Sequence, residues 1–138
     1  MPPQQKGANL QVGREAEVRL SIPASPEFLR LARLAAAGLA SRMGFTYDEV
    51  EDLRIAIDEL CFSLVGNTGR PGTIVLRYWM QDDSLVVEGV GQFDDGMGTS
   101  PSLSPLSQQI LKAVVDEHEL TIGKDGPEFR LLKKHVAG

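Results

Sequence analysis

The spacing of apolar residues along this chain changes from a period of two to a period of 3.6, and this change limits the folds it can adopt. From 15 to 22, apolar and polar residues alternate, which is typical of a half-buried strand. From 28 to 43 and from 50 to 64, apolar residues recur every three or four positions, which predicts two consecutive amphipathic helices. Thr46 and Glu49 fit a capping box at the start of the second helix.

The second half of the chain is expected to add two hairpins and one helix. Residues 73–80 and 85–93 predict the first hairpin, and 120–122 with 129–132 predict the second. Between them, Ser104 and the proline after it are expected to begin a third helix. This order predicts an α/β (α+β) two-layer sandwich, in which three helices cover one face of a mixed, mostly antiparallel sheet. The residues expected to be buried between the two layers are Ile57, Leu60, Leu64, Ile110 and Val114.

Composition agrees with one globular domain of 138 residues, of which 42% are apolar and 24% charged. Residues 1–13 are rich in Gln, Pro and Gly, so we expect a flexible tail there and a single domain over 14–138. No apolar run approaches the roughly 18 residues that span a bilayer, and the N-terminus lacks the hydrophobic region of a signal peptide. Cys61 is the only cysteine, so no intramolecular disulfide can form. We therefore expect a cytoplasmic protein without membrane contact.

The charge balance argues against direct binding to nucleic acid. Lys and Arg number 14 and Asp and Glu number 19, which gives a net charge of −5, whereas a nucleic-acid binder usually has a basic face. The tight basic group Arg130, Lys133 and Lys134 is expected to be the solvated side of a final strand. An acidic surface is compatible with a basic protein partner.

Two adjacent acids, Asp58 and Glu59, interrupt the apolar pattern of the second predicted helix. Glu59 lies one turn before Ser63, so these two side chains are expected to point the same way. Taken alone, this pattern also fits an amphipathic helix whose acids form its solvated edge.

The segment 52–61 (DLRIAIDELC), together with the element order over about 14–136, resembles the anti-sigma-factor serine kinases, particularly divergent actinobacterial-type members. These kinases have the ATP-binding fold shared by gyrase, Hsp90, histidine kinases and MutL. The resemblance implies a histidine-kinase-like ATPase (Bergerat) fold, with Glu59 as the general base that activates the attacking hydroxyl. Where the family has an Asn that completes the Mg²⁺ shell, this chain has Ser63, whose hydroxyl could still bind the metal.

The family's second box, Asp-x-Gly-x-Gly after a strand, contacts the adenine amino group through its Asp. Residues 94–98 (DDGMG) match this string, although turn formation explains the same residues equally well. The family's spacing instead points to Gly89 or Gly91, and neither position supplies an Asp. The nucleotide-contacting candidates are Asp94, Gly96 and Gly98.

The third box of the family is a glycine-rich lid that leads into a helix N-terminus, where phosphates bind to free N–H groups. The corresponding residues 99–107 contain Pro101 and Pro105 and no glycine, and proline lacks an N–H donor. All three boxes are therefore altered, and we expect Mg-ATP binding to be weak or absent.

The resemblance implies a regulator of transcription that binds a sigma factor and is controlled by an anti-anti-sigma protein. The sigma factor is expected to bind the first helix, where Arg30, Arg33 and Arg42 project from an apolar stripe. The family also implies a homodimer formed through the sheet region. Two alternatives stay open: an active ATP-dependent protein serine kinase that phosphorylates an anti-anti-sigma factor, and a nucleotide-free domain with another partner.

Overall fold

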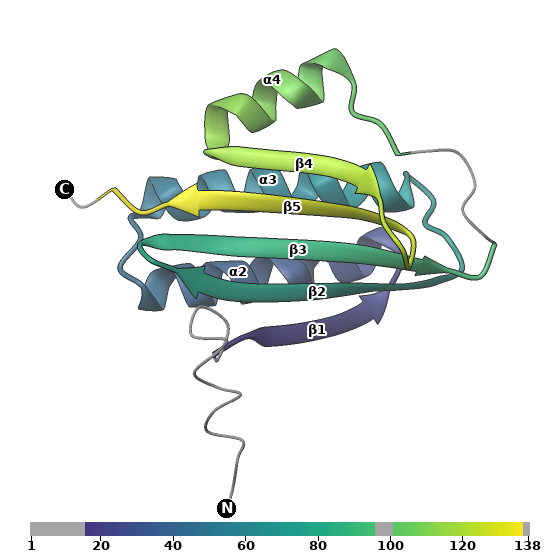
Figure 1. Ribbon diagram of the computed structural model, residues 1–138, viewed down its shortest axis with the longest axis horizontal. Coiled ribbons are helices and arrows are strands. Elements are labelled where there is room, and N and C mark those ends of the chain that lie inside the picture. Colours follow the sequence, from purple (N-terminus) through teal and green to yellow (C-terminus); the bar gives the residue numbers. More distant parts are fainter. Residues whose placement is uncertain (1–15, 96–100, 137–138) are drawn as a thin grey trace, which may run out of the picture.

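The computed structural model describes residues 16–95 and 101–136, and these form two layers, one of strands and one of helices (Figure 1). The strands make a five-stranded sheet in the order β1-β2-β3-β5-β4. Every neighbouring pair in this sheet is antiparallel, which confirms the predicted sheet type. The strands are β1 (Val18–Pro23), β2 (Gly72–Gln81), β3 (Ser84–Phe93), β4 (Glu117–Ile122) and β5 (Pro127–Lys134).

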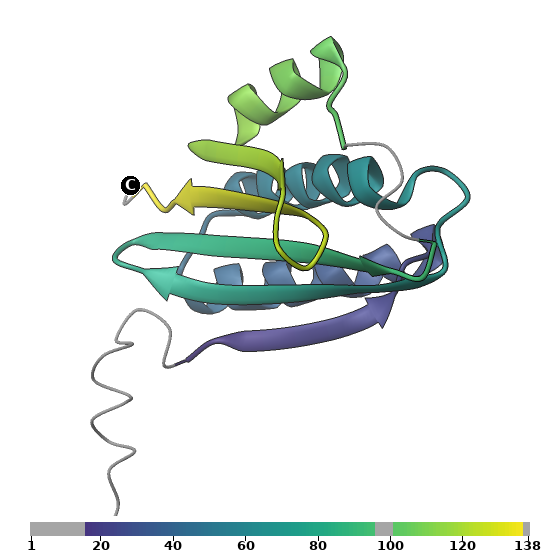
Figure 2. The same cartoon turned by 45° about the vertical axis from the view of Figure 1, so that its right-hand side comes forward.

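The helices lie on one side of this sheet, as predicted. Helices α2 and α3 run behind the strands, and α4 lies beyond the edge strand β4, where it packs against α3 (Figure 1 and Figure 2). None of the described helices has both the length and the apolarity that crossing a membrane requires. The helical segments are the 3-10 turn η2 (Pro26–Phe28), α2 (Leu29–Arg42), α3 (Tyr47–Val65) and α4 (Pro105–Val114).

The helix boundaries follow local signals in the sequence. The Glu49 N–H donates to Thr46 Oγ1 at 3.1 Å and the Thr46 N–H donates to Glu49 Oε1 at 2.8 Å, so the predicted capping box is confirmed. Just after α2, Gly44 has a φ of +88°, a left-handed conformation that costs glycine little. Ser104 caps α4, because its hydroxyl oxygen accepts a hydrogen bond from the Ser107 N–H at 3.0 Å.

Two strand boundaries differ from the prediction. The first strand begins at Val18, while the predicted tail over 1–13 and the predicted first residue of that strand lie outside the described residues. Strand β4 begins at Glu117, three residues early, because its ladder with β5 continues to the pair of Glu117 and Leu132. In that part of β4 the residue on the inner side of the sheet is His118, so the apolar alternation is too weak to predict a strand.

The core lies between the sheet and the helices and is largely as predicted. Ile110 is half-buried rather than buried, because α4 packs at the edge of the sheet. Cys61 is fully buried, and this burial raises the pKa of its thiol to about 12, as expected for an unreactive core cysteine. The predicted core residues that are buried are Ile57, Leu60, Leu64 and Val114.

Candidate functional site

Glu59, the acid that the resemblance assigns as general base, contacts the first turn of α4. Its Oε1 accepts a hydrogen bond from the Ser107 hydroxyl at 2.6 Å. The Ser104 hydroxyl in turn donates to Ser107 Oγ at 3.1 Å. Ser107 falls in the segment predicted to correspond to the family's lid. Its contact with Glu59, 48 positions earlier, could not be predicted from the residues around either one.

Ser63 lies one turn after Glu59 on α3, as the spacing predicts. It is half-buried, and its hydroxyl donates to the Leu60 carbonyl at 2.5 Å, a bond from the side chain to the backbone of the preceding turn. A metal ion would bind Ser63 through the lone pairs of this hydroxyl oxygen. Among the residues that the structure describes, no three His, Cys, Asp or Glu side chains cluster closely enough to hold a metal ion.

The second predicted box lies in a turn directly after β3. The Asp94 side chain is exposed, and its backbone N–H donates to the Pro71 carbonyl at 2.8 Å. Asp95 forms an ion pair with Arg70 at 2.8 Å, and the hydrogen bond from Arg70 holds the pKa of the Asp95 carboxyl below its usual range. The remaining candidates, Gly96 and Gly98, lie outside the described residues.

Two aromatic rings occupy the space where the family's spacing would place the adenine-contacting Asp. A Cβ added to Gly89 would lie 2.4 Å from the Phe129 ring, and one added to Gly91 would lie 2.3 Å from the Phe93 ring. The Arg70 guanidinium covers the Phe93 ring at 3.9 Å from its centroid. A carboxylate therefore fits at neither glycine unless a ring moves, which the sequence alone does not reveal.

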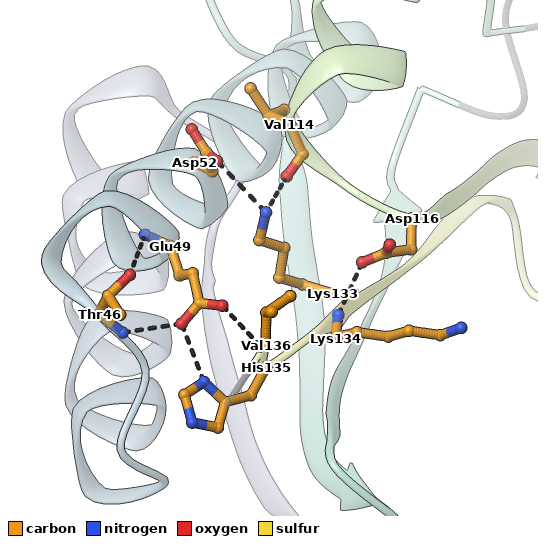
Figure 3. Close-up of polar contacts among 9 residues, drawn as sticks. All are labelled: Thr46, Glu49, Asp52, Val114, Asp116, Lys133, Lys134, His135 and Val136. Atoms are coloured by element: carbon orange, nitrogen blue, oxygen red, sulfur yellow. Dashed lines mark hydrogen bonds and ion pairs between the residues drawn. The ribbon is translucent and has the colours of Figure 1, made fainter. Parts of the chain in front are cut away.

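A second group of polar contacts joins the end of β5 to the start of α3 (Figure 3). The buried Glu49 carboxylate accepts hydrogen bonds from the N–H groups of Thr46 and Val136, both at 2.8 Å, and lies 2.9 Å from Nδ1 of His135. Burial alone would raise its pKa, but these partners outweigh burial and lower the pKa of Glu49 to about 2. The His135 ring also stacks on Phe45, with centroids 5.1 Å apart.

Lys133 overturns one prediction, because it is not on the solvated side of the last strand. Its side chain is 13% exposed and lies between α3 and α4 (Figure 3). The Lys133 ammonium donates to Asp52 Oδ2 at 3.2 Å and to the Val114 carbonyl at 2.8 Å. Desolvation of the charge is offset by these two partners, which tie the end of α4 to α3 and β5.

The outer surface of α2 and α3 carries apolar and basic side chains. The sequence predicts such a surface for the first helix, which is α2. Arg30, Arg33, Leu34 and Arg54 line a groove there, and we call these four residues the α2 groove. Leu34 is 60% exposed. Arg33 pairs with Asp58 at 2.6 Å, which fixes α2 against α3.

The third arginine predicted for this surface, Arg42, lies elsewhere. It lines a separate groove at the C-terminal end of α2, together with Met43, Trp79 and Met80. The structure therefore brings Arg30 and Arg33 together but not Arg42, because Arg42 comes more than two turns later in the helix.

The chain is similar in sequence to named serine-protein kinases, although no protein-family model matches it. It is 39% identical over 85 residues to the serine-protein kinase RsbW of Bacillus pumilus, which covers 56% of this chain and 52% of that protein. It is 32% identical over 100 residues to the RsbW of Halalkalibacterium halodurans, covering 70% of this chain and 62% of that protein. The chain thus spans between about half and three-fifths of the length of these curated relatives.

The fold has a counterpart among crystal structures. It matches the structure of the RsbU and RsbW domains of a Mycobacterium tuberculosis protein with a TM-score of 0.65 and 16% identity, over 88% of this chain and 33% of that chain. The antiparallel sheet with its helix layer defines the class, a domain of the histidine-kinase-like ATPase fold. Within this class the chain is a relative of the RsbW serine-protein kinases, which confirms the resemblance to the anti-sigma-factor serine kinases.

Proposed function

We propose that this protein is an anti-sigma-factor-like regulator of transcription, which binds a sigma factor and is controlled by an anti-anti-sigma protein. The observation that carries the proposal is its similarity to RsbW kinases combined with an altered nucleotide site. An interaction role needs the fold and its surface, whereas a kinase also needs the adenine and phosphate contacts. We further propose that residues 14–138 act as one cytoplasmic domain that pairs through the sheet region.

The surface proposed for the sigma factor is the α2 groove. Two of its arginines are paired within the chain, Arg33 with Asp58 and Arg54 with Glu51, so the exposed Leu34 is the apolar contact that the groove offers a partner. Leu34→Asp is therefore expected to weaken the complex at least tenfold. Leu106→Asp is a matched control, because Leu106 is 69% exposed on α4, away from α2.

The test is a pull-down of individually expressed sigma factors from the source organism, followed by titration of the one that binds. Retained binding by Leu106→Asp with loss in Leu34→Asp would support the proposed surface. Absence of any complex at micromolar concentration would contradict the proposed function itself.

Weak binding of Mg-ATP is the second part of the proposal. Neither Gly89 nor Gly91 supplies the family's Asp, and an aromatic ring lies against each of them. The Ser63 hydroxyl replaces the amide oxygen of the family's Asn. Each lost charged or bidentate contact costs on the order of 1.5–3 kcal/mol. Two such losses would move a micromolar site by roughly a hundredfold or more, toward millimolar.

Isothermal titration with Mg-ATP measures this directly. A dissociation constant below about ten micromolar would contradict the prediction, because the lost contacts would then not have weakened Mg-ATP binding as expected. Ser63→Asn alone is expected to recover little affinity, because the adenine contact is still missing.

A second candidate function, an active protein serine kinase, is supported by one contact. Glu59 accepts a serine hydroxyl at 2.6 Å, which is within the range over which a general base accepts a proton. If the chain phosphorylates an anti-anti-sigma protein, Glu59→Ala should abolish transfer while leaving the sigma-factor complex intact. Turnover unchanged by Glu59→Ala would show that another group is the base.

A further inference from the structure

Helix α4 is fastened to α3 at both of its ends, each time through an acid of α3. At its start, Ser107 donates to Glu59, and at its end Lys133 bridges the Val114 carbonyl and Asp52. Asp52 and Glu59 are seven positions apart, so they lie on the same stripe of α3, two turns from one another. The position of α4 therefore depends on Glu59, the same acid that the second candidate function, a serine kinase, assigns as the general base.

The contact between Ser107 and Glu59 has the geometry of an acceptor hydroxyl bound to its base. An O–H···O distance of 2.6 Å falls in the range for a hydroxyl that donates to a carboxylate. The Ser104 hydroxyl donates to Ser107 Oγ, so the Ser107 proton is directed to Glu59. The N-cap bond from the Ser107 N–H to Ser104 Oγ fixes this turn further.

We propose that Ser107 is an internal mimic of an acceptor hydroxyl: it occupies the position on Glu59 that a hydroxyl of a protein partner would take. A partner serine or threonine that takes the same position on Glu59 Oε1 must displace Ser107 and shift the first turn of α4. Ser107 is thus a positioning residue that controls access to Glu59. The role of Ser107 as a mimic rests on the proposed role of Glu59 as general base, whereas the hydrogen bond between the two residues is independent of that role.

Access to Glu59 can be measured without any partner or nucleotide. The full chain is treated with a water-soluble carbodiimide and glycine ethyl ester, and the rate at which each carboxylate is labelled is followed by peptide mass spectrometry. Ser107→Ala is expected to speed labelling of Glu59 at least threefold, because the hydroxyl that covers Oε1 is gone. Labelling of Asp52, which Lys133 holds, is expected to stay unchanged in the same sample.

Two further variants make the result specific. Ser102→Ala removes an exposed hydroxyl five residues earlier and should leave labelling of Glu59 unchanged. Ser107→Thr keeps the hydroxyl and should restore slow labelling. Hydrogen exchange of 101–114 should rise in Ser107→Ala alone, which a purely local change at Glu59 would not produce.

Equal labelling of Glu59 in the wild type and Ser107→Ala would overturn the proposal. Faster labelling of Asp52 and Glu59 together would also overturn it, because that result indicates general loosening rather than release of one contact. Neither readout involves a sigma factor, so a failed sigma-factor complex and a failed access test are distinguishable outcomes.

Discussion

Replacing Leu60 with alanine is expected to lower the free energy of unfolding by about 2–5 kcal/mol. Leu60 lies on the inner face of α3 and is completely buried between the helices and the sheet. Truncation removes apolar contacts and leaves a cavity that a close-packed core cannot fully close. Chemical denaturation monitored by circular dichroism measures the change.

Ile55→Ala provides the matched control for Leu60→Ala. Ile55 is an aliphatic residue on the same helix but is 42% exposed, so its truncation should cost less than about 1.5 kcal/mol. If the two variants lost equal stability, the inner face of α3 would not be the packed side of the helix.

The protein is expected to lose stability as the pH falls from 4.5 toward 2, through protonation of Glu49. The pKa of Glu49 is lowered from 4.5 to about 2 in the folded state, so the folded state favours the charged form. The resulting stabilisation is fully present above pH 4.5 and disappears as the carboxylate is protonated. The gap between the two pKa values sets an upper limit of about 3 kcal/mol.

Glu49→Gln tests this expectation. At pH 7 the variant should be less stable than the wild type by up to about 3 kcal/mol, and the difference should shrink as the pH approaches 3. Glu117→Gln changes an exposed glutamate on β4 and should show a small difference at every pH. A difference for Glu49→Gln that stayed constant between pH 7 and 3 would contradict the role assigned to its carboxylate.

The parts of the fold that could be predicted depend on neighbouring residues. The capping box at Thr46 and the glycine after α2 act over a single helical turn, so the sequence displays them directly. The start of β4 could not be predicted, because its residues become a strand through pairing with β5. Sheet order also follows from such distant pairing, which periodicity within one element does not encode.

The candidate site also has features that could be predicted from the sequence and features that could not. The spacing of Glu59 and Ser63 follows from helix geometry and could be predicted, whereas the partner of Glu59 could not, since Ser107 comes from a different helix. The absence of an Asp at Gly89 is visible in the sequence. The Phe129 ring that lies against Gly89 from β5 appears only when the strands are paired.

The interior place of β5, between β3 and β4, has a consequence for how the protein is made. Strand β3 pairs with β5 from Val90 with Glu128 to Ser84 with Lys134, across about 40 to 50 intervening positions. While the chain emerges from the ribosome, one edge of β3 therefore stays unpaired until residues 127–134 have been synthesised. Unpaired strand edges invite association between chains, and distant strand pairing is slow to form. Truncated or stalled chains that end before β5 should accordingly be the aggregating species during expression.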